Sequence, residues 1–432
     1  MQFKYGLNDR LPFAELLMLG FQWFALSIPT IAIIGKVVGT VQVLAPIDQT
    51  GYIQKMLFVV SVALFCQILW GHRLPLILGP STVLLIGIIS SRGFEANTVY
   101  SSILLGGAIL TALSISGLFG YLQRFFTPQV VATVLILIAL TLAPTVMNLI
   151  TVAEQRVPPT INLSFSVALT MALFVCYRFT KGVWRSTVIL WAMIGGSALY
   201  FLMFPRCFVA ETLFRGSAVS PFFSGFTTGL SIEPGVLVSF LFCFFALSIN
   251  DLGSIQSMKE LIDPPRMGGR IRRGIAFTGV ANVVAGFFGV IGPVNYSLSP
   301  GVIAATGSAS RFTLLPASML LFLLSFSPFV VGLMGNIPPV VVGSILIYIL
   351  SYQVAAGLIV AFQREKAFEL RDGLVVGLPI LLGTIVAFFP TSVLSGLPPA
   401  LRPIVGNGFV VGVLSALVLE HVIFPLKYLK KP

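Results

Sequence analysis

The stretch RLPLILGPS, Arg73–Ser81, interrupts what would otherwise be an apolar run of membrane length. Pro75, Gly79 and Pro80 disfavour a continuous helix, because proline lacks the amide hydrogen that a helix needs and glycine is conformationally free. A second such stretch, IGPVNYSLSPG, occupies Ile291–Gly301. Each stretch adjoins a short apolar segment, so we expect both segments to contain non-helical backbone.

The two interrupted stretches hold equivalent positions in two halves of the chain. The first apolar segment begins near Phe13 and the eighth near Gly235, which is an offset of 222 residues. The same offset carries Pro80 to position 302, next to Pro300 and Gly301. Short segments interrupted by Gly and Pro at matching places in two halves typically mark the binding site of a secondary transporter. The alternative is a pair of helices kinked for packing.

The composition places the whole chain in a membrane. Of its 432 residues, 57% are hydrophobic and only 9% are charged, and the mean hydropathy is +1.00. A soluble protein carries about a quarter charged residues. Apolar stretches of roughly 18 or more residues recur from one end to the other, as bilayer-spanning helices require. These features exclude a secreted enzyme, a nucleic-acid-binding protein and a disordered protein.

The apolar runs predict fourteen segments, two of them short. They are Phe13–Ile34, Tyr52–Trp70, Leu74–Ile89, Ser101–Leu122, Gln129–Met147, Ile161–Arg178, Ser186–Phe204, Gly235–Ile255, Gly274–Ile291, Ser299–Thr313, Leu314–Met334, Pro338–Phe362, Gly373–Phe389 and Pro403–Phe424.

The distribution of basic residues supports this count. With both ends cytoplasmic, 19 of the 26 Lys and Arg residues fall in inner loops and 7 in outer loops, as the positive-inside rule predicts. The net charge of +12 is therefore a topology signal, and no nucleic acid partner is needed. The cluster Arg266–Arg273 is expected to anchor the inner surface and to contact anionic lipid. We expect an integral protein of the bacterial inner membrane.

No residue pattern indicates an enzyme, a cofactor or a metal site. The four cysteines form no CxxC pair, and His72 and His421 are the two histidines. HExxH and GxSxG motifs are absent, and no paired carboxylates lie deep in the apolar runs. We expect His72 and Arg73 to form a cytoplasmic turn.

The run YSLSPGVIAATGSASR, Tyr296–Arg311, resembles the tenth-segment signature of the nucleobase–ascorbate transporters, also called xanthine/uracil permeases. The matching positions are Tyr296, Ser297, Gly301, Ala304, Thr306, Gly307, Ser310 and Arg311. RLPLILGPS resembles the start of the third segment of that family. Runs beginning at Ile337, Leu370 and Gly406 resemble its twelfth, thirteenth and last segments.

The resemblance implies an all-α polytopic membrane protein with 14 transmembrane segments, arranged as 7+7 inverted repeats. Segments 3 and 10 would each combine a short extended stretch with a half-helix, and the substrate would bind between them. Residues 1–125 and 234–335 would form a core domain, and residues 126–233 and 336–432 a gate domain. Family members typically act as homodimers, by elevator-like movement of the core against the gate.

The chain departs from the family at positions that bind the base. Gln22 and Trp23 stand where the family usually has Gln-His. A substrate-binding Glu would fall at Leu247, and a Gln or Glu at Leu298, which Ser299 follows in place of Asn. Leucine cannot pair with the polar edge of a base, and unpaired polar groups cost several kcal/mol. Recognition of a base in the usual manner is therefore in question.

Three carboxylates fall inside the expected segments, and Asp251 is the one beside the candidate site. Glu15 and Glu420 are expected at the interface, near Arg10 and Lys427. An ionisable residue inside a membrane is a candidate functional group by default. Burial would favour the protonated form of Asp251, so we expect it to couple transport to protons. The alternative is a structural role, in which Asp251 holds an arginine or backbone amides.

Further side chains are expected around Asp251. The supporting residues are Asn250 on its own helix and Thr306 and Arg311 on the tenth segment. Ser248 on the helix of Asp251 and Gln22 on the first segment are expected to bind substrate, and Ser27 points at the same core. Gly79, Pro80, Ser81 and Thr82 would begin one half-helix, and Ser299 and Gly301 the other. Tyr296, Ser297, Leu298, Trp23 and Leu247 complete the expected substrate site.

The expected function is a secondary active transporter that imports a nucleobase-like heterocycle or an organic anion together with a proton. An alternative follows from the two helix N-termini, whose positive potential suits an anion. The sulfate-permease family has the same architecture and carries anions, so a small-anion transporter is the second candidate.

Overall fold

The computed structural model describes residues 3–42, 44, 46–122, 125, 127–151, 157–207, 222, 225–296, 299–362, 369–390, 393–394, 396–398 and 401–425. Within these ranges the chain is almost entirely helical. Eight of the helices are long and apolar enough to cross a membrane, or nine if one bent pair counts as a single crossing.

The first half contains the elements that follow Phe13 in order along the chain. They are α1 (Phe13–Val41), α2 (Pro46–Leu69), β1 (Leu78–Pro80), α3 (Thr82–Ser90), α4 (Ala96–Ile115), α5 (Phe119–Leu122), α6 (Pro128–Thr141), α7 (Ala143–Thr151), α8 (Pro159–Phe179), α9 (Gly182–Ser186), α10 (Val188–Met203) and the 3₁₀ turn Pro205–Cys207.

The second half repeats the pattern of long helices around one short strand. Its elements are α12 (Pro234–Ile262), α13 (Met267–Phe287), β2 (Pro293–Asn295), α14 (Ser299–Thr306), the 3₁₀ turn Arg311–Thr313, α15 (Leu314–Ser325), α16 (Pro328–Gly335), α17 (Pro339–Phe362), α18 (Leu370–Ala387), α20 (Arg402–Val405), α21 (Gly408–Val418) and the π turn Leu419–Ile423.

Every expected segment coincides with helix, but not every segment is one straight helix. The eleventh bends by 91° between α15 and α16, where Pro328 cannot donate a backbone hydrogen bond to the preceding turn. The fifth divides into α6 and α7. Because fewer than fourteen helices have the length of a crossing, the count of fourteen transmembrane segments remains a prediction.

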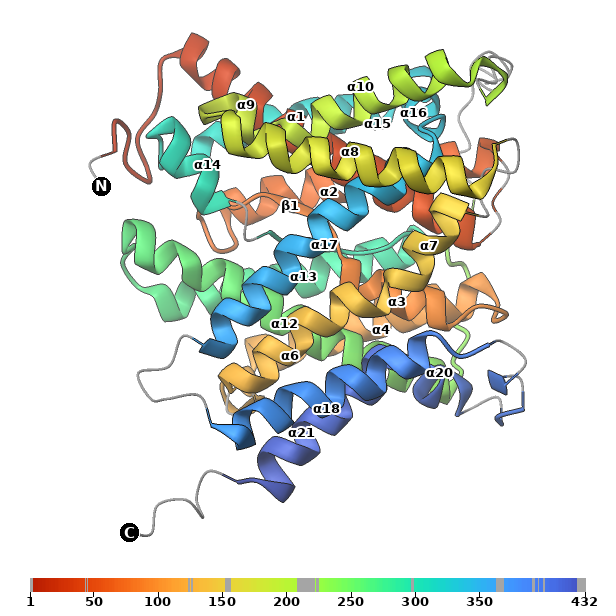
Figure 1. Ribbon diagram of the computed structural model, residues 1–432. Helices are drawn as coiled ribbons and strands as arrows, with labels where there is room; N and C mark the ends of the chain where they lie inside the picture. The colour runs from red at the N-terminus through yellow and green to blue at the C-terminus, as the bar shows by residue number, and fades with distance from the viewer. Residues whose placement is uncertain are drawn as a thin grey trace.

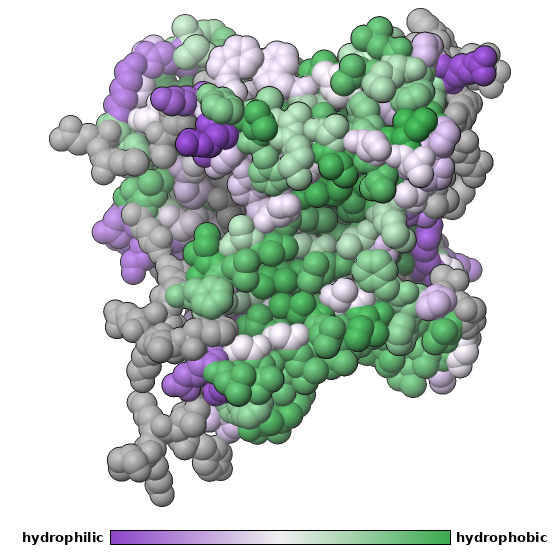
Figure 2. All heavy atoms as spheres, viewed as in Figure 1, coloured by the Kyte–Doolittle hydropathy of each residue, from purple (hydrophilic) through white to green (hydrophobic). Residues whose placement is uncertain are grey.

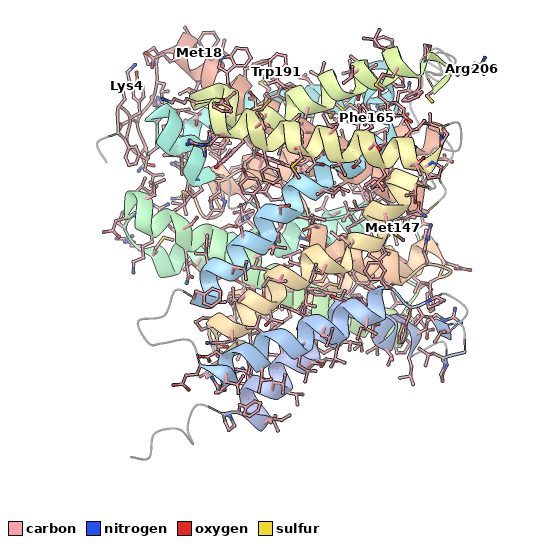
Figure 3. All side chains as sticks on the ribbon, in the orientation of Figure 1. Lys4, Met18, Met147, Phe165, Trp191 and Arg206 are labelled. Carbon is pink, nitrogen blue, oxygen red and sulfur yellow. The ribbon has the colours of Figure 1, made fainter. Side chains whose placement is uncertain are left out.

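Many of the helices run from side to side in Figure 1. Figure 2 shows hydrophilic residues gathered mainly at the left and right margins, with a broad hydrophobic band between them. Lys4 lies near the left margin and Arg206 near the right one (Figure 3). Lys4 and Arg206 therefore lie at opposite margins of the hydrophobic band.

Helices from the two halves of the chain pack against each other. In one group α4 packs on α13, α2 and α1 pack on α15, and α12 packs on α3 and α4. In the other group α6 and α8 pack on α17, and α18 packs on α6 and α21. Small residues bring α4 and α13 close, because a Cβ atom at Gly107 would lie 2.7 Å from the carbonyl oxygen of Gly279.

Candidate functional site

The two interrupted stretches meet as a pair of antiparallel strands. Leu78 is opposite Asn295, Gly79 is opposite Val294, and Pro80 is opposite Pro293. Pro80 and Pro293 have no amide hydrogen, so neither can donate to the ladder. We call this pair of strands, Leu78–Pro80 and Pro293–Asn295, the crossover. From the crossover α3 and α14 run in opposite directions, α3 toward the right and α14 toward the left of Figure 1. The expected extended stretches followed by half-helices are therefore present in both halves.

The crossover continues past the strands through backbone hydrogen bonds. Tyr296 donates its amide to the carbonyl of Ile77 at 2.9 Å, and Ser81 donates its amide to the carbonyl of Gly292 at 3.0 Å. The first half-helix begins at Thr82, one residue after its cap. Gly79 and Pro80 were expected in the start of that helix, but they belong to β1.

Buried serines organise the starts of both half-helices. The Ser81 hydroxyl accepts the Leu84 amide at 3.3 Å and caps α3. The Ser299 hydroxyl accepts the Ile77 amide at 3.0 Å and donates to the Tyr296 carbonyl at 3.3 Å. Both serines are fully buried. Helix N-termini carry a partial positive charge, so the crossover places two such charges close to the strands.

The ring of Tyr296 covers β1. Its hydroxyl donates to the carbonyl of Pro80 at 2.8 Å. A Cβ atom at Gly79 would lie 2.5 Å from three atoms of this ring, including the hydroxyl oxygen. Glycine is therefore required at position 79 for the tyrosine to lie flat on the strand. The aromatic face lies directly at the crossover, where a planar ligand could stack.

Asp251 on α12 contacts the crossover through one residue of β2. It is fully buried. Its Oδ1 accepts both the side-chain amide and the backbone amide of Asn295, the latter at 3.3 Å. Within the described ranges, Oδ2 accepts no hydrogen bond of normal geometry, and no cation pairs with the carboxylate. Asp251 therefore lies beside the two strands, and its part in a substrate or coupling site stays a prediction.

His72 is part of the same network, which the sequence did not indicate. We expected a cytoplasmic turn, and the residue does lie in a turn after α2, but its side chain is fully buried. Its Nε2 lies 3.1 Å from Oδ1 of Asn295, and its Nδ1 accepts the Leu74 amide at 2.9 Å. Asn295 and His72 are 223 positions apart, so no local pattern could connect them.

Other polar groups hold the crossover to the helices around it. Ser254, one turn after Asp251, donates to the carbonyl of Asn295 at 3.0 Å. The Asn282 amide on α13 donates to the carbonyl of Pro293 at 3.0 Å. Gln67 on α2 donates to the Thr278 hydroxyl at 3.1 Å and accepts the backbone amide of His72. Strand β2 is thus held from three directions by hydrogen bonds.

Several expected site residues contribute to packing near the crossover. Leu247 is fully buried one turn before Asp251. Ser248 donates to the carbonyl of Phe245, within its own helix. Gln22 and Trp23 are buried on α1, and the Trp23 indole donates to the Thr313 hydroxyl at 3.0 Å. Ser297 and Leu298 lie outside the described residues.

The remaining expected residues lie farther along α14 or beyond it. Gly301 has open space around its Cβ position, on the exposed side of the half-helix. Thr306 bonds back to the carbonyl of Val302 at the end of α14. Arg311 donates to the carbonyl of Ile68 at 2.7 Å, near the end of α2. Asn250 is half-buried beside Asp251.

The described part of the chain holds no group of three or more His, Cys, Asp or Glu side chains that could bind a metal ion. Two cavities outlined by described residues lie away from the crossover. One is apolar and is formed by α6, α7, α8 and α17. The other lies between the adjoining ends of α1, α3 and α4. At the crossover, the chain's own side chains, above all Tyr296, fill the space over β1.

Two solved structures that resemble this fold are of anion transporters. The transmembrane domain of a cyanobacterial bicarbonate transporter, BicA, superposes with a TM-score of 0.64 at 13% identity, covering 88% of this chain and 98% of that chain. The murine anion transporter Slc26a9 in its inward-facing state superposes with a TM-score of 0.60 at 14% identity, covering 95% of this chain and 69% of that one. At these identities the likeness concerns the fold alone.

Sequence relatives cover nearly the whole chain. A putative purine permease of Clostridium perfringens is 25% identical over 97% of this chain and 92% of its own length. The xanthine permease of Bacillus subtilis is 24% identical over 95% of this chain and 94% of its own length. The xanthine permease XanP of Escherichia coli is 24% identical over 98% and 94%.

A match to a protein family agrees with the strand and half-helix arrangement and with these relatives. Residues 14–392 match the xanthine/uracil permease profile, which is described as a permease family. The matched region includes both strands, both half-helices and Asp251. Members of this family are transporters, as the sequence led us to expect, and not enzymes. The chain is thus an integral membrane permease and belongs to the xanthine/uracil permease family.

Proposed function

We propose that this permease carries an oxidised purine, of the xanthine or uric acid type, across the membrane together with a proton. The observation that carries the proposal is the β1–β2 crossover between two half-helices, with Asp251 buried beside it, in a chain that matches the family over residues 14–392. The printed activities of the relatives, xanthine permease and uric acid permease, supply the substrate class.

The crossover offers the chemistry that such a substrate needs without the usual acidic side chain. Purine carbonyl groups are hydrogen-bond acceptors, and the amides that begin α3 and α14 are donors with a partial positive charge. The Tyr296 ring gives a planar surface for stacking. Uric acid and xanthine lose a proton readily, and an anionic ring would gain from the two helix N-termini with Leu247 in place of an acid.

Asp251 is the proposed site of proton coupling. Its carboxylate is buried with neutral donors on one oxygen and without a paired cation in the described ranges. A buried carboxylate without a cation is stabilised by taking up a proton. Opening toward one side of the membrane would return it to water and release that proton.

We further propose the arrangement that the family resemblance implies. Residues 1–125 and 234–335 form a core domain, and residues 126–233 and 336–432 form a gate domain. The packing of α4 on α13 and of α6 on α17 supports this grouping. Movement of the core against the gate, in a homodimer with fourteen transmembrane segments and both ends in the cytoplasm, would expose the crossover to each side in turn.

Uptake into proteoliposomes tests the substrate. Labelled xanthine, uric acid, guanine and uracil are compared with sulfate, bicarbonate and a dicarboxylate, with and without an inward proton gradient. We expect gradient-driven uptake of an oxidised purine. Uptake of an inorganic anion alone would contradict the proposal and favour the second candidate, an anion carrier built on the two helix N-termini.

The variant Asp251→Asn tests the coupling. Asparagine keeps an oxygen that accepts from Asn295 but cannot take up a proton. We expect the variant to lose accumulation driven by a proton gradient and to retain exchange of internal for external substrate. Unchanged accumulation in this variant would rule out the coupling role of Asp251.

A further inference from the structure

The two ring nitrogens of His72 have different and unambiguous partners. A backbone amide can only donate, so Nδ1, which accepts the Leu74 amide at 2.9 Å, carries no proton. The proton of the neutral ring is therefore on Nε2, which lies 3.1 Å from the Asn295 side-chain oxygen. His72 is fully buried, so water does not compete for either nitrogen.

The proton on Nε2 determines how the Asn295 amide is turned. Because Nε2 donates, the Oδ1 atom of Asn295 must face the histidine, and its NH₂ group must face Asp251. If the amide were turned over, two donors would meet at His72 and two acceptors would meet at Asp251. The histidine thus holds the amide in the orientation that suits an ionised carboxylate.

This orientation makes the two oxygens of Asp251 unequal. Oδ1 accepts from both the side chain and the backbone of Asn295. Oδ2 has no hydrogen-bond donor of normal geometry within the described ranges, although the Thr278 hydroxyl is close enough to interact with the carboxylate. A proton on Oδ1 would displace a donor, so Oδ2 is the oxygen that can receive one.

The charged groups around the network are cationic and act on the backbone. Arg270 of α13 donates to the carbonyls of His72 and Arg73 at 2.9 Å each, which opposes a positive charge on the His72 ring. On α13 the other two arginines, 272 and 273, bond to the carbonyls of residues 115 and 269. No titratable side chain occurs in helices α3, α6, α14 and α21 or in strand β2.

Two further helices that pack on α12 carry titratable groups, and both groups lie away from the network. Tyr100 of α4 donates to the side chain of Gln42, beyond the end of α1. Arg402 belongs to α20, which adjoins the beginning of α12, since Asn407 just after α20 bonds to Ser239. Ser239 precedes Asp251 by 12 residues, or roughly 18 Å along a helix.

We propose that His72 is a positioning residue for Asp251: through the Asn295 amide it keeps Oδ1 occupied by donors and leaves Oδ2 as the oxygen that exchanges the proton. The inference rests on the proposed coupling role of Asp251. His72 itself stays neutral when Asp251 gains or loses its proton, because Nδ1 accepts a hydrogen bond from a backbone amide. The network thus adds a residue from the turn before β1 to the coupling site.

The first test uses the unmodified protein. The chain has only two histidines, and His421 is far less buried than His72. Nitrogen NMR of protein labelled at histidine, in nanodiscs, should show one ring that stays in the neutral Nε2–H form from pH 5 to 8. The variant His421→Gln assigns the two signals. A buried ring with the proton on Nδ1, or one that titrates in this range, would overturn the proposal.

A matched pair of variants tests the effect on Asp251. In His72→Gln, the side-chain nitrogen stands near the place of Nε2 and can still donate to Asn295. In His72→Asn, the amide reaches only the place of Nδ1, so the donor to Asn295 is lost. Infrared titration of the purified protein follows the carboxylic acid band that Asp251→Asn removes.

We expect His72→Asn to raise the pH of half-protonation of this carboxyl by about one unit, because the Asn295 amide is no longer held with its NH₂ group toward Asp251 and its hydrogen bond to the ionised carboxylate weakens. His72→Gln should shift it by less than half as much. In an Asn295→Ala background, His72→Asn should cause no further shift. An unshifted His72→Asn, or an equal shift of both variants that persists without Asn295, would overturn the proposal.

Failure of this inference and failure of the proposed function give different results. The infrared titration needs no substrate, so an incorrect substrate class leaves its outcome readable. If Asp251→Asn removes a titrating band and abolishes coupling while His72→Asn shifts nothing, only the positioning role is wrong. If Asp251→Asn removes no band, both the positioning role and the coupling role are wrong, whether or not a purine is transported.

Discussion

Two buried networks of ionisable side chains lie in this permease, and they differ in whether a cation is present. Beside α18 and α21, Arg371 bonds to Asp372 at 3.1 Å and to Glu420 at 2.9 Å. Beside the crossover, Asp251 is surrounded by neutral donors from Asn295. In the first network one guanidinium pairs with two carboxylates. The second contains a carboxylate that no described cation balances.

The presence or absence of a cation separates carboxylates with a structural role from a carboxylate that can take up a proton. Asp372 and Glu420 form ion pairs with the guanidinium between them, and Gln129 donates to Asp372 at 3.0 Å. Protonating either of them would break an ion pair. Protonating Asp251 breaks none and removes a buried charge. Burial alone therefore does not distinguish the proposed coupling residue from Asp372 and Glu420; the lack of a described partner cation does.

The largest expected effect comes from removing the cation of the first network. Arg371→Ala leaves two carboxylates buried without a counter-charge, and we expect it to lower the stability by about 3–5 kcal/mol. Asp251→Asn removes an unbalanced carboxylate and should leave the stability unchanged or higher. Thermal unfolding of both purified variants in the same detergent measures the contrast. Equal losses in the two variants would mean that the networks are not different in kind.

Glu420→Gln provides the intermediate case. It removes one ion pair and leaves Arg371 paired with Asp372, so its loss of stability should lie between those of the other two variants. The sequence placed Glu420 at the membrane interface near Lys427. In the structure it is buried, with 1% of its side chain exposed, and its partner is Arg371. This partner lies 49 residues away on another helix, and Lys427 lies outside the described residues.

At the crossover we expect added side-chain volume to be destabilising, whereas in the Arg371 network we expect the loss of a charge to be destabilising. Gly79→Ala would place a methyl group 2.5 Å from the Tyr296 ring. We expect overpacking to cost about 1–3 kcal/mol and to abolish transport. Thermal unfolding and uptake of labelled xanthine measure the two effects.

Two variants show whether the ring is the cause. Gly301→Ala has open space at its Cβ position and should be tolerated, although it lies in the opposite half-helix. Tyr296→Ala removes the ring, so adding it to Gly79→Ala should recover the lost stability. If Gly79→Ala remains equally destabilising without the ring, the close approach of Tyr296 does not explain the glycine.

The backbone of the site could be predicted from sequence because its signals are local. Proline and glycine at Pro75, Gly79 and Pro80 disfavour helix wherever they occur, and the repeat offset places their counterpart near Pro300. Asp251 could be predicted for a similar reason, since one charged residue in an apolar helix is costly in any arrangement. Each of these inferences needed only the residues on one segment.

The partners of these residues could not be predicted, because they come from distant segments. His72 follows α2 next to Arg73, and this setting is typical of a surface turn. Its partners Asn295 and Arg270 are 223 and 198 positions away, on β2 and α13, and only Gln67 is local. The same reason applies to Tyr296, which the family signature places at the site but which local sequence does not place over Gly79.

The smallest expected effect concerns the contact between the two regions. Asn407 caps α21 and donates to the hydroxyls of Ser90 on α3 and Ser239 on α12, at 3.0 Å each. If the core moves against the gate, these bonds must break during each cycle. Ser239→Ala removes one neutral hydrogen bond, worth about 1 kcal/mol, so substrate exchange should become roughly fivefold faster where this separation limits the rate. Ser415→Ala, which removes a bond within α21 only, should leave the rate unchanged. Equal rates for Ser239→Ala and the unmodified protein would mean that α12 and α21 stay together in the slow step, and would argue against movement along this contact.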